Sequence, residues 1–199
     1  MKDILIQYMK RFTDFSEAEL ETITADIPLE EFKKGTVLLH QGEVPEKCYF
    51  VLKGCVRQFA IDEAGKETTS NFFTEEQGVT IFNQHTSEKK SKYSLSCLED
   101  CVLVVGDLSI EQQMYDEHAG LESMTLKMIE KNMGEMHDDF AAFIASRPEE
   151  RYQILLEKRP ELIDRVPQHQ LASYLGITPE SLSRIKRRLE RPHLRKVQD

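Results

Sequence analysis

The stretch at 168–187 reads QHQLASYLGITPESLSRIKR. Small Ala172 stands at its fifth position, where a second helix would cross the first, and Gly176 stands at its ninth, where the chain must turn sharply. Thr178 suits the cap of the second helix, and Pro179 suits its first turn. These features predict two helices joined by a tight turn, a helix-turn-helix. Its buried side is expected from Leu171, Leu175, Ile177, Leu182 and Ile185.

The second predicted helix has a basic outer face opposite its apolar residues, and such a helix fits the major groove of B-DNA. We expect Glu180, Ser181 and Arg184 to face the bases: the carboxylate can accept from cytosine, and the guanidinium can bond guanine O6 and N7 together. The alternative is that Glu180 and Arg184, four residues apart, pair on a solvated face. Phosphate contacts are expected from Thr178, Lys186, Arg187, Arg188 and Arg191.

Charge divides the chain into two parts. Residues 1–145 carry 14 basic and 27 acidic side chains, whereas residues 146–199 carry 12 and 8. The division falls at Ser146-Arg147-Pro148, which suits the end of one helix and the start of the next. An acidic body would lie away from DNA and disfavour non-specific wrapping. We therefore expect a domain boundary at residue 146, with the basic helix-turn-helix on its C-terminal side.

Short β-rich runs separated by glycines fill the first half of the chain and predict an antiparallel sandwich or barrel. Before them, Ser16 and Glu19 form a capping box that begins a helix, and Pro28 ends it. Gly65 suits the tip of a hairpin. The expected strands are 37–40, 48–52, 56–61, 68–73, 93–98 and 102–105.

Helical periodicity returns over 108–145. One apolar stripe recurs in steps of three and four, and Leu121, Met124 and Met128 form a second stripe beside it. The first stripe is either a dimer seam or ordinary core packing, since it covers fewer than three heptads. A dimer would use Leu126, Ile129, Met133, Met136, Phe140 and Phe143.

Several classes of protein are excluded by composition. The four cysteines form no CxxC pair, and no histidines are spaced to bind a metal on one helix, so neither a metal nor an iron–sulfur site is expected. Apolar runs are too short to span a bilayer, and Asp3 and Gln7 interrupt the region where an export signal would lie, so a cytoplasmic protein is expected. An enzyme on the β-domain would need clustered ligands or a nucleophile–base pair, and the sequence suggests neither.

The whole chain resembles the Crp/Fnr family of bacterial transcription regulators. The resemblance is most specific at 33–67 (KKGTVLLHQGEVPEKCYFVLKGCVRQFAIDEAGKE) and at 165–189 (RVPQHQLASYLGITPESLSRIKRRL). It implies an α+β fold of three parts. An antiparallel β-roll, or jelly roll, of the cyclic-nucleotide-binding kind forms a sensor domain with N-terminal helices at 1–117. A long dimerisation helix at 118–145 and a helical helix-turn-helix DNA-binding domain at 146–199 follow it. The implied partners are double-stranded DNA, a second copy of the chain and RNA polymerase, with no membrane.

Two departures from the family pattern bear on function. Cyclic-nucleotide binders of the family carry a Gly-Glu pair and then an arginine, whereas here Gly78 precedes Val79 and Lys92 stands without an arginine. We therefore do not expect cyclic AMP to bind, because lysine cannot form the bidentate fork. The chain also lacks an evident wing after Leu189, and Pro192 is expected to end the last helix. A ligand, if there is one, is expected beside Gly78, Val79, Ser91, Lys92, Tyr93, Ser94, Met124 and Met128.

Together these features predict a homodimeric transcription regulator that reads a near-palindromic site in the major groove. A signal in the β-roll, other than cyclic AMP, would control it. The alternative is a small-molecule sensor that acts through protein contacts and keeps a vestigial helix-turn-helix.

Overall fold

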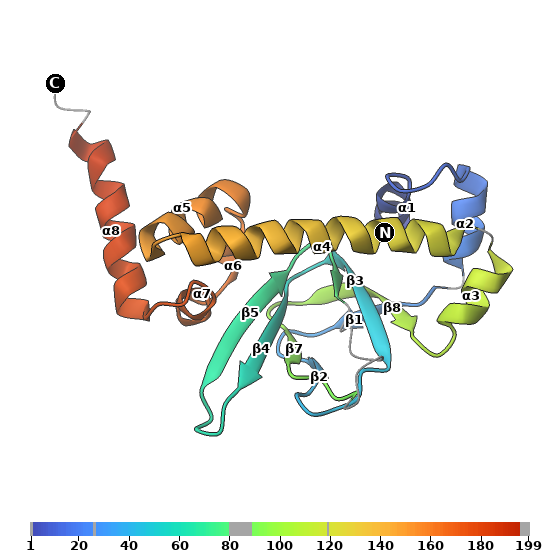
Figure 1. Cartoon of the computed structure of the whole chain (residues 1–199), viewed down its shortest axis with the longest axis horizontal. Coiled ribbons are helices and arrows are strands. Elements are labelled where there is room, and N and C mark those ends of the chain that lie inside the picture. Colours follow the sequence, from blue (N-terminus) through green and yellow to red (C-terminus); the bar gives the residue numbers. More distant parts are fainter. Residues whose placement is uncertain (1, 26, 80–88, 119, 196–199) are drawn as a thin grey trace.

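The computed structural model describes residues 2–25, 27–79, 89–118 and 120–195, with backbone alone at 111–112 and 190–195. Two short helices, α1 (Lys2–Met9) and α2 (Glu17–Ala25), open the chain (Figure 1). The predicted capping box is confirmed at α2. The Ser16 backbone N–H donates to the Glu19 carboxylate at 2.8 Å, and the Glu19 N–H donates back to the Ser16 hydroxyl at 3.3 Å.

A β-roll of two antiparallel four-stranded sheets follows, in the orders β1-β8-β3-β6 and β2-β7-β4-β5. All the predicted strands are confirmed. Two others were not predicted: β1 carries two glutamates in four residues, and β6 is only two residues long. The strands are β1 (Leu29–Phe32), β2 (Val37–Leu39), β3 (Lys47–Lys53), β4 (Val56–Ile61), β5 (Glu67–Phe73), β6 (Gly78–Val79), β7 (Ser94–Cys97) and β8 (Cys101–Asp107).

The inside of the roll is packed with side chains from both sheets. Its buried residues come mainly from β3, β7 and β8, and they are nearly inaccessible to solvent. They include Tyr49, Val51, Val56, Val79, Leu95, Cys97, Cys101, Leu103 and Val105.

Helix α3 (Glu111–Glu117) leads into α4 (Leu121–Ala145), which passes along one side of the roll (Figure 1). Gly120 separates the two helices with a φ of +92°, so the long helix begins at Leu121 rather than at residue 118 as expected. At 25 residues, α4 is about 37 Å long. Its first turns pack on α1, α2 and β3, where Leu121 and Met124 are buried.

Four helices complete the fold: α5 (Pro148–Lys158), α6 (Leu162–Arg165), α7 (Gln168–Tyr174) and α8 (Pro179–Arg195). Pro192 does not end α8, because the helix continues to Arg195. The described chain thus finishes in a helix, without a hairpin wing. The core of this domain is formed by Tyr152, Leu155, Leu162, Val166, Leu171, Ala172, Leu175, Leu182 and Ile185.

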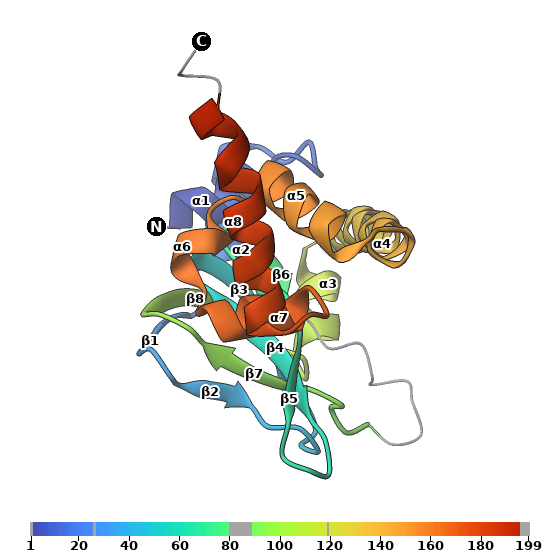
Figure 2. The same ribbon diagram turned by 90° about the vertical axis from the view of Figure 1, so that its left-hand side faces the viewer.

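This helical domain lies against the roll at β5 (Figure 2). Cys55 and Phe72 of the roll belong to the same buried cluster as Leu171 of α7. The Phe72 and Tyr174 rings meet edge to face, with centroids 5.3 Å apart. The roll and the helical domain therefore share one apolar core.

Candidate nucleic-acid interface

The turn between α7 and α8 has the geometry that the sequence predicted. Gly176 has a φ of +70°, which a residue with a side chain adopts only under strain. The Ile177 N–H donates to the Ala172 carbonyl at 3.0 Å, which closes the turn. Ala172 is fully buried beneath the second helix, so the helix-turn-helix is confirmed as a fold.

The first turn of α8 is capped by Thr178, whose hydroxyl accepts from the Ser181 N–H at 3.2 Å. The Arg184 guanidinium donates to the Ser181 hydroxyl at 3.1 Å, and in the described structure it forms no ion pair with Glu180. The Glu180 backbone N–H and the Thr178 hydroxyl hold the pKa of the Glu180 carboxyl below its ordinary value. The carboxyl thus stays an acceptor at neutral pH.

The expected phosphate-contacting residues differ in how free they are. Arg187 is exposed, whereas Arg188 forms an ion pair with Glu149 of α5 at 2.7 Å. Lys186 is half-buried, with its amine 6.0 Å from the centre of the Tyr152 ring. The side chain of Arg191 lies outside the described residues. Both arginines are exposed, so Arg187 differs from Arg188 in that, within the described residues, it is not held in an ion pair.

An open groove of about 810 Å³ lies between the start of α7 and the outer face of α8. Glu180, Arg184 and Arg187 line it, so the structure brings three of the predicted residues to one surface. Sequence reasoning missed the other lining residues. Ser183 lies one helical turn after Glu180, a spacing that indicates the same face. The missed residues are Gln168, His169, Pro179 and Ser183.

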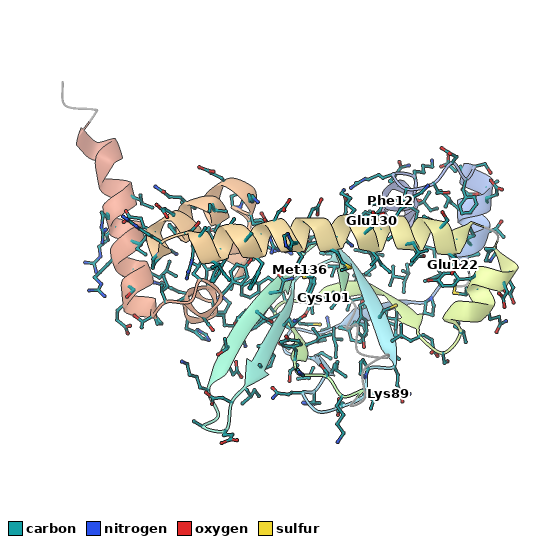
Figure 3. All side chains as sticks on the ribbon, viewed as in Figure 1. Phe12, Lys89, Cys101, Glu122, Glu130 and Met136 are labelled. Carbon is teal, nitrogen blue, oxygen red and sulfur yellow. The ribbon has the colours of Figure 1, made fainter. Side chains whose placement is uncertain are left out.

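The apolar stripe of α4 is largely uncovered beyond the first turns. Met133, Met136 (Figure 3) and Phe140 are 56% to 62% exposed, and Leu126 is 59% exposed. Ile144, which was not predicted, is 64% exposed. Clustered exposed apolar residues of this kind mark an interaction surface.

Two members of the predicted stripe are partly covered by the chain itself. Ile129 is half-buried. Phe143 is half-buried as well, and the Arg151 guanidinium lies 3.9 Å from the centre of its ring. Phe143 therefore contacts the C-terminal helical domain of its own chain.

Comparison with known proteins identifies the fold. Residues 29–118 match the family model described as the cyclic nucleotide-binding domain. A transcriptional regulator of the CRP/FNR family from Thermus thermophilus superposes with a TM-score of 0.62 at 18% identity, over 83% of this chain and 87% of that one. The chain has the Crp/Fnr fold. The resemblance read from the sequence is thus confirmed for the architecture.

Two other solved structures share this Crp/Fnr architecture. FixK2 from Bradyrhizobium japonicum has a TM-score of 0.69 at 17% identity, over 84% of this chain and 86% of that one. The c-di-GMP responsive global regulator CLP from Xanthomonas campestris has a TM-score of 0.66 at 17% identity, over 90% and 94%. No curated protein has a significantly similar sequence.

Among the described residues, the predicted ligand residues of the Crp/Fnr roll lie in different surroundings. Val79 is buried in the roll core. Buried Ser91 donates to the Tyr93 carbonyl at 2.6 Å, and the hydroxyl of buried Ser94 accepts from the Gln41 N–H at 2.9 Å. Of the expected stretch 78–94, residues 80–88 lie outside the described residues.

The other predicted ligand residues differ in position and in exposure. Lys92 is exposed, and Gly78 and Tyr93 are half-buried. Met124 and Met128 pack instead with α1 and α2, in a different apolar cluster. Met124 lines a depression of about 300 Å³ there, together with Phe12, Phe15, Gly120 and Lys127.

Three of the four cysteines are buried, and Cys48 is half-buried. All four are free thiols, and burial raises the pKa of the Cys55 thiol to about 12, which keeps it protonated. Within the described residues, no group of His, Cys, Asp and Glu side chains is arranged to hold a metal ion. None of the described helices combines the length and apolarity needed to cross a bilayer.

Proposed function

We propose that this protein is a homodimeric transcription regulator that reads DNA in the major groove with α8. The observation that carries the proposal is the open groove lined by Glu180, Arg184 and Arg187 over a fully packed underside. A rigid helix with exposed arginines on one face suits direct base readout. Glu180, Ser181 and Arg184 are the base-facing residues, and Ser183 lies on the same face.

We assign the contacts to DNA phosphates to the side chains that flank the base-facing residues. Arg187 is the principal one because it is exposed and lines the groove. Lys186 and Arg188 contribute less to phosphate binding. Each interacts with a side chain of α5, and that interaction must break before the cation can contact a phosphate. Thr178 also faces this region, although its hydroxyl serves the cap.

We place the contact with a second copy of the chain on the exposed apolar stripe of α4. Leu126, Met133, Met136 and Phe140 repeat at helical spacing, and an equivalent helix would cover them as in a coiled coil. A two-fold pair would place two α8 helices in successive major grooves about 34 Å apart. The DNA site is then an inverted repeat. RNA polymerase, which the family resemblance implies as a partner, is part of the same proposal.

We propose that the controlling signal acts on the roll, and that this signal is not a cyclic nucleotide. Lys92 supplies one ammonium group where a cyclic phosphate would need a bidentate arginine. The Ser91 and Ser94 hydroxyls already have partners within the chain. Cyclic AMP is therefore expected to leave both the unfolding temperature and the DNA affinity unchanged.

Selection of bound sequences from a random DNA library tests this proposal. We expect enrichment of an inverted repeat, because the two α8 helices of a dimer would enter successive major grooves. Its half-sites should lie about 10 to 10.5 base pairs apart, or a multiple of that. Arg184→Ala should reduce affinity for the selected site, whereas Lys66→Ala, which removes an exposed cation on the roll, should not. Failure to enrich any sequence would overturn the proposal and favour a sensor that acts through protein contacts.

A further inference from the structure

The DNA-binding domain is tied to the roll by Arg165, which lies at the end of α6. Its guanidinium donates two hydrogen bonds to the Glu75 carboxylate, at 2.8 and 2.9 Å, and further ones to Glu99. The Arg165 side chain is 22% exposed. Bidentate bonds of this kind fix orientation as well as distance. We call Arg165, Glu75 and Glu99 the Arg165 cluster.

The Glu75 carboxylate is also held by a turn of the roll. Glu75 also accepts from the Gly54 N–H at 2.9 Å. Gly54 has a φ of +108°, and a Cβ there would lie 2.9 Å from the Cys101 Cα, so this turn is tightly packed. The residue after Glu75 is also fixed, because the Glu76 N–H donates to the Val51 carbonyl at 2.9 Å. Arg165 is therefore bound to a rigid end of the roll.

A second set of contacts lies beside the cluster, on β5. The Thr69 N–H donates to the Ser173 hydroxyl of α7 at 3.0 Å. Arg159 of the helical domain donates to the Phe72 carbonyl at 2.8 Å. With the Phe72–Tyr174 ring contact, these bonds hold the first helix of the helix-turn-helix directly on the roll.

The docked position leaves the DNA-facing surface open. Arg165 is not among the residues that line the groove between α7 and α8, and Arg184 and Arg187 remain exposed. Figure 2 shows α7 beside the strands, with α8 extending away from them. The contact with the roll therefore supports the helix-turn-helix without covering its DNA-facing side.

From these contacts we infer that the Arg165 cluster holds the helix-turn-helix in the orientation that binds DNA, so that the roll sets DNA affinity through its own side chains as well as through α4. The inference rests on the proposed function. A preoriented domain loses less orientational freedom on binding than a loose one, which raises affinity without any new DNA contact. Glu75 lies three positions before Gly78, the first residue of β6, so a change in the roll at β6 would reach Arg165 through a short, hydrogen-bonded path.

Hydrogen exchange of the full-length protein tests the docking without DNA. In Arg165→Gln, amides of β5 and α7 should exchange about tenfold faster, since charge-assisted bonds that limit local opening are lost. Lys158→Gln is the matched control, because Lys158 pairs with Asp139 of α4 and not with the roll. Equal exchange in Arg165→Gln and wild type would overturn the inference, even if the protein does not bind DNA.

Operator affinity tests the functional part. Arg165→Gln and Glu75→Gln should each weaken binding to the selected site about tenfold, with the preferred sequence unchanged. The double variant should bind no more weakly than the weaker single variant, because both substitutions remove the same interaction.

Two outcomes would overturn the inference. One is tighter binding by the variants. The other is a loss confined to Arg165→Gln with a lower salt dependence, which would make Arg165 a phosphate contact. Glu75→Gln keeps a side chain of equal size on an exposed residue, so it remains informative if Arg165→Gln folds poorly.

Discussion

Arg151 stacks on Phe143, with the guanidinium carbon 3.9 Å from the centre of the ring, and so joins the last turns of α4 to the C-terminal helical domain. The same guanidinium donates to the Phe143 carbonyl at 3.0 Å and to the Leu175 carbonyl at 3.2 Å. One side chain thus links α4, α5 and the turn of the helix-turn-helix. Gly176 lies against it, because a Cβ there would be 3.2 Å from the Arg151 Nη1.

Arg151→Ala should lower the free energy of unfolding by roughly 1–3 kcal/mol, because it removes the stacking and leaves two carbonyls with one partner fewer. Chemical denaturation measures this value. Gln153→Ala, at an exposed position of the same helix, should change it by less than about 0.5 kcal/mol. Equal effects of the two variants would contradict the role given to Arg151.

Gly176→Ala should destabilise the protein by about 1–2 kcal/mol, because a side chain would be strained at a φ of +70°. Gly134→Ala is the control, and it should stabilise the protein instead. Gly134 lies within α4, and a Cβ there meets nothing within 4 Å, so alanine should add about 0.5–1 kcal/mol. Thermal unfolding of the two variants distinguishes backbone strain from a general effect of replacing glycine.

Met136→Glu should prevent dimerisation, since it places a charge on the apolar stripe at the centre of the proposed interface. Sedimentation equilibrium measures the dissociation constant. We expect it to rise by at least about 100-fold, corresponding to roughly 2.7 kcal/mol or more. Glu130→Gln, at an exposed polar position of the same helix, should leave it nearly unchanged. A wild-type protein that is monomeric at all concentrations would contradict the assignment of the stripe.

Arg187→Ala should reduce the slope of log affinity against log salt by about 1, because one phosphate contact is lost. Arg188→Ala should reduce the slope less, since Arg188 is paired with Glu149 before binding. Titrations of the selected DNA at several salt concentrations give both slopes. Equal reductions would mean that the Arg188 ion pair opens at no cost when DNA binds.

Acid should weaken the Arg165 cluster. Burial opposes ionisation of Glu75, but the bonds from Arg165 and from the Gly54 N–H outweigh it and hold the pKa of this carboxyl below its ordinary value of 4.5. A lowered folded-state pKa gives stability that is present above pH 4.5 and lost as pH falls through the folded value. The stability difference between wild type and Glu75→Gln should therefore shrink as the pH is lowered from about 6 to about 3. A constant difference would contradict the ion pairing.

Much of the architecture could be predicted because local patterns determine it. Alternating β-rich runs indicated six strands, the spacing of Ala172 and Gly176 indicated the helix-turn-helix, and Ser16 with Glu19 indicated a helix start. Strand β1 was not predicted, because its two glutamates make the segment less apolar than the other strands. Its pairing with β8 nevertheless orders it. These are elements whose hydrogen bonds or apolar faces can be recognised within a few residues.

Contacts between distant segments could not be predicted in this way. Arg165 is 90 residues from Glu75 and 66 from Glu99, and nothing local indicates that they meet. Met124 was assigned to a ligand site, but its partners lie on α1 and α2, helices whose packing depends on the whole fold. Gln168 and His169 join the groove only because the turn brings the start of α7 beside α8.

The crowded turn at Gly54 has a consequence for genetics. Any side chain at this position would push against the Cys101 backbone and displace the amide that holds Glu75, far along the chain from the residues proposed to face DNA. If the proposed function holds, a random mutational screen for loss of promoter recognition should therefore recover substitutions at codon 54. Such alleles would resemble damage to α8, although the lesion lies in the roll that supports it.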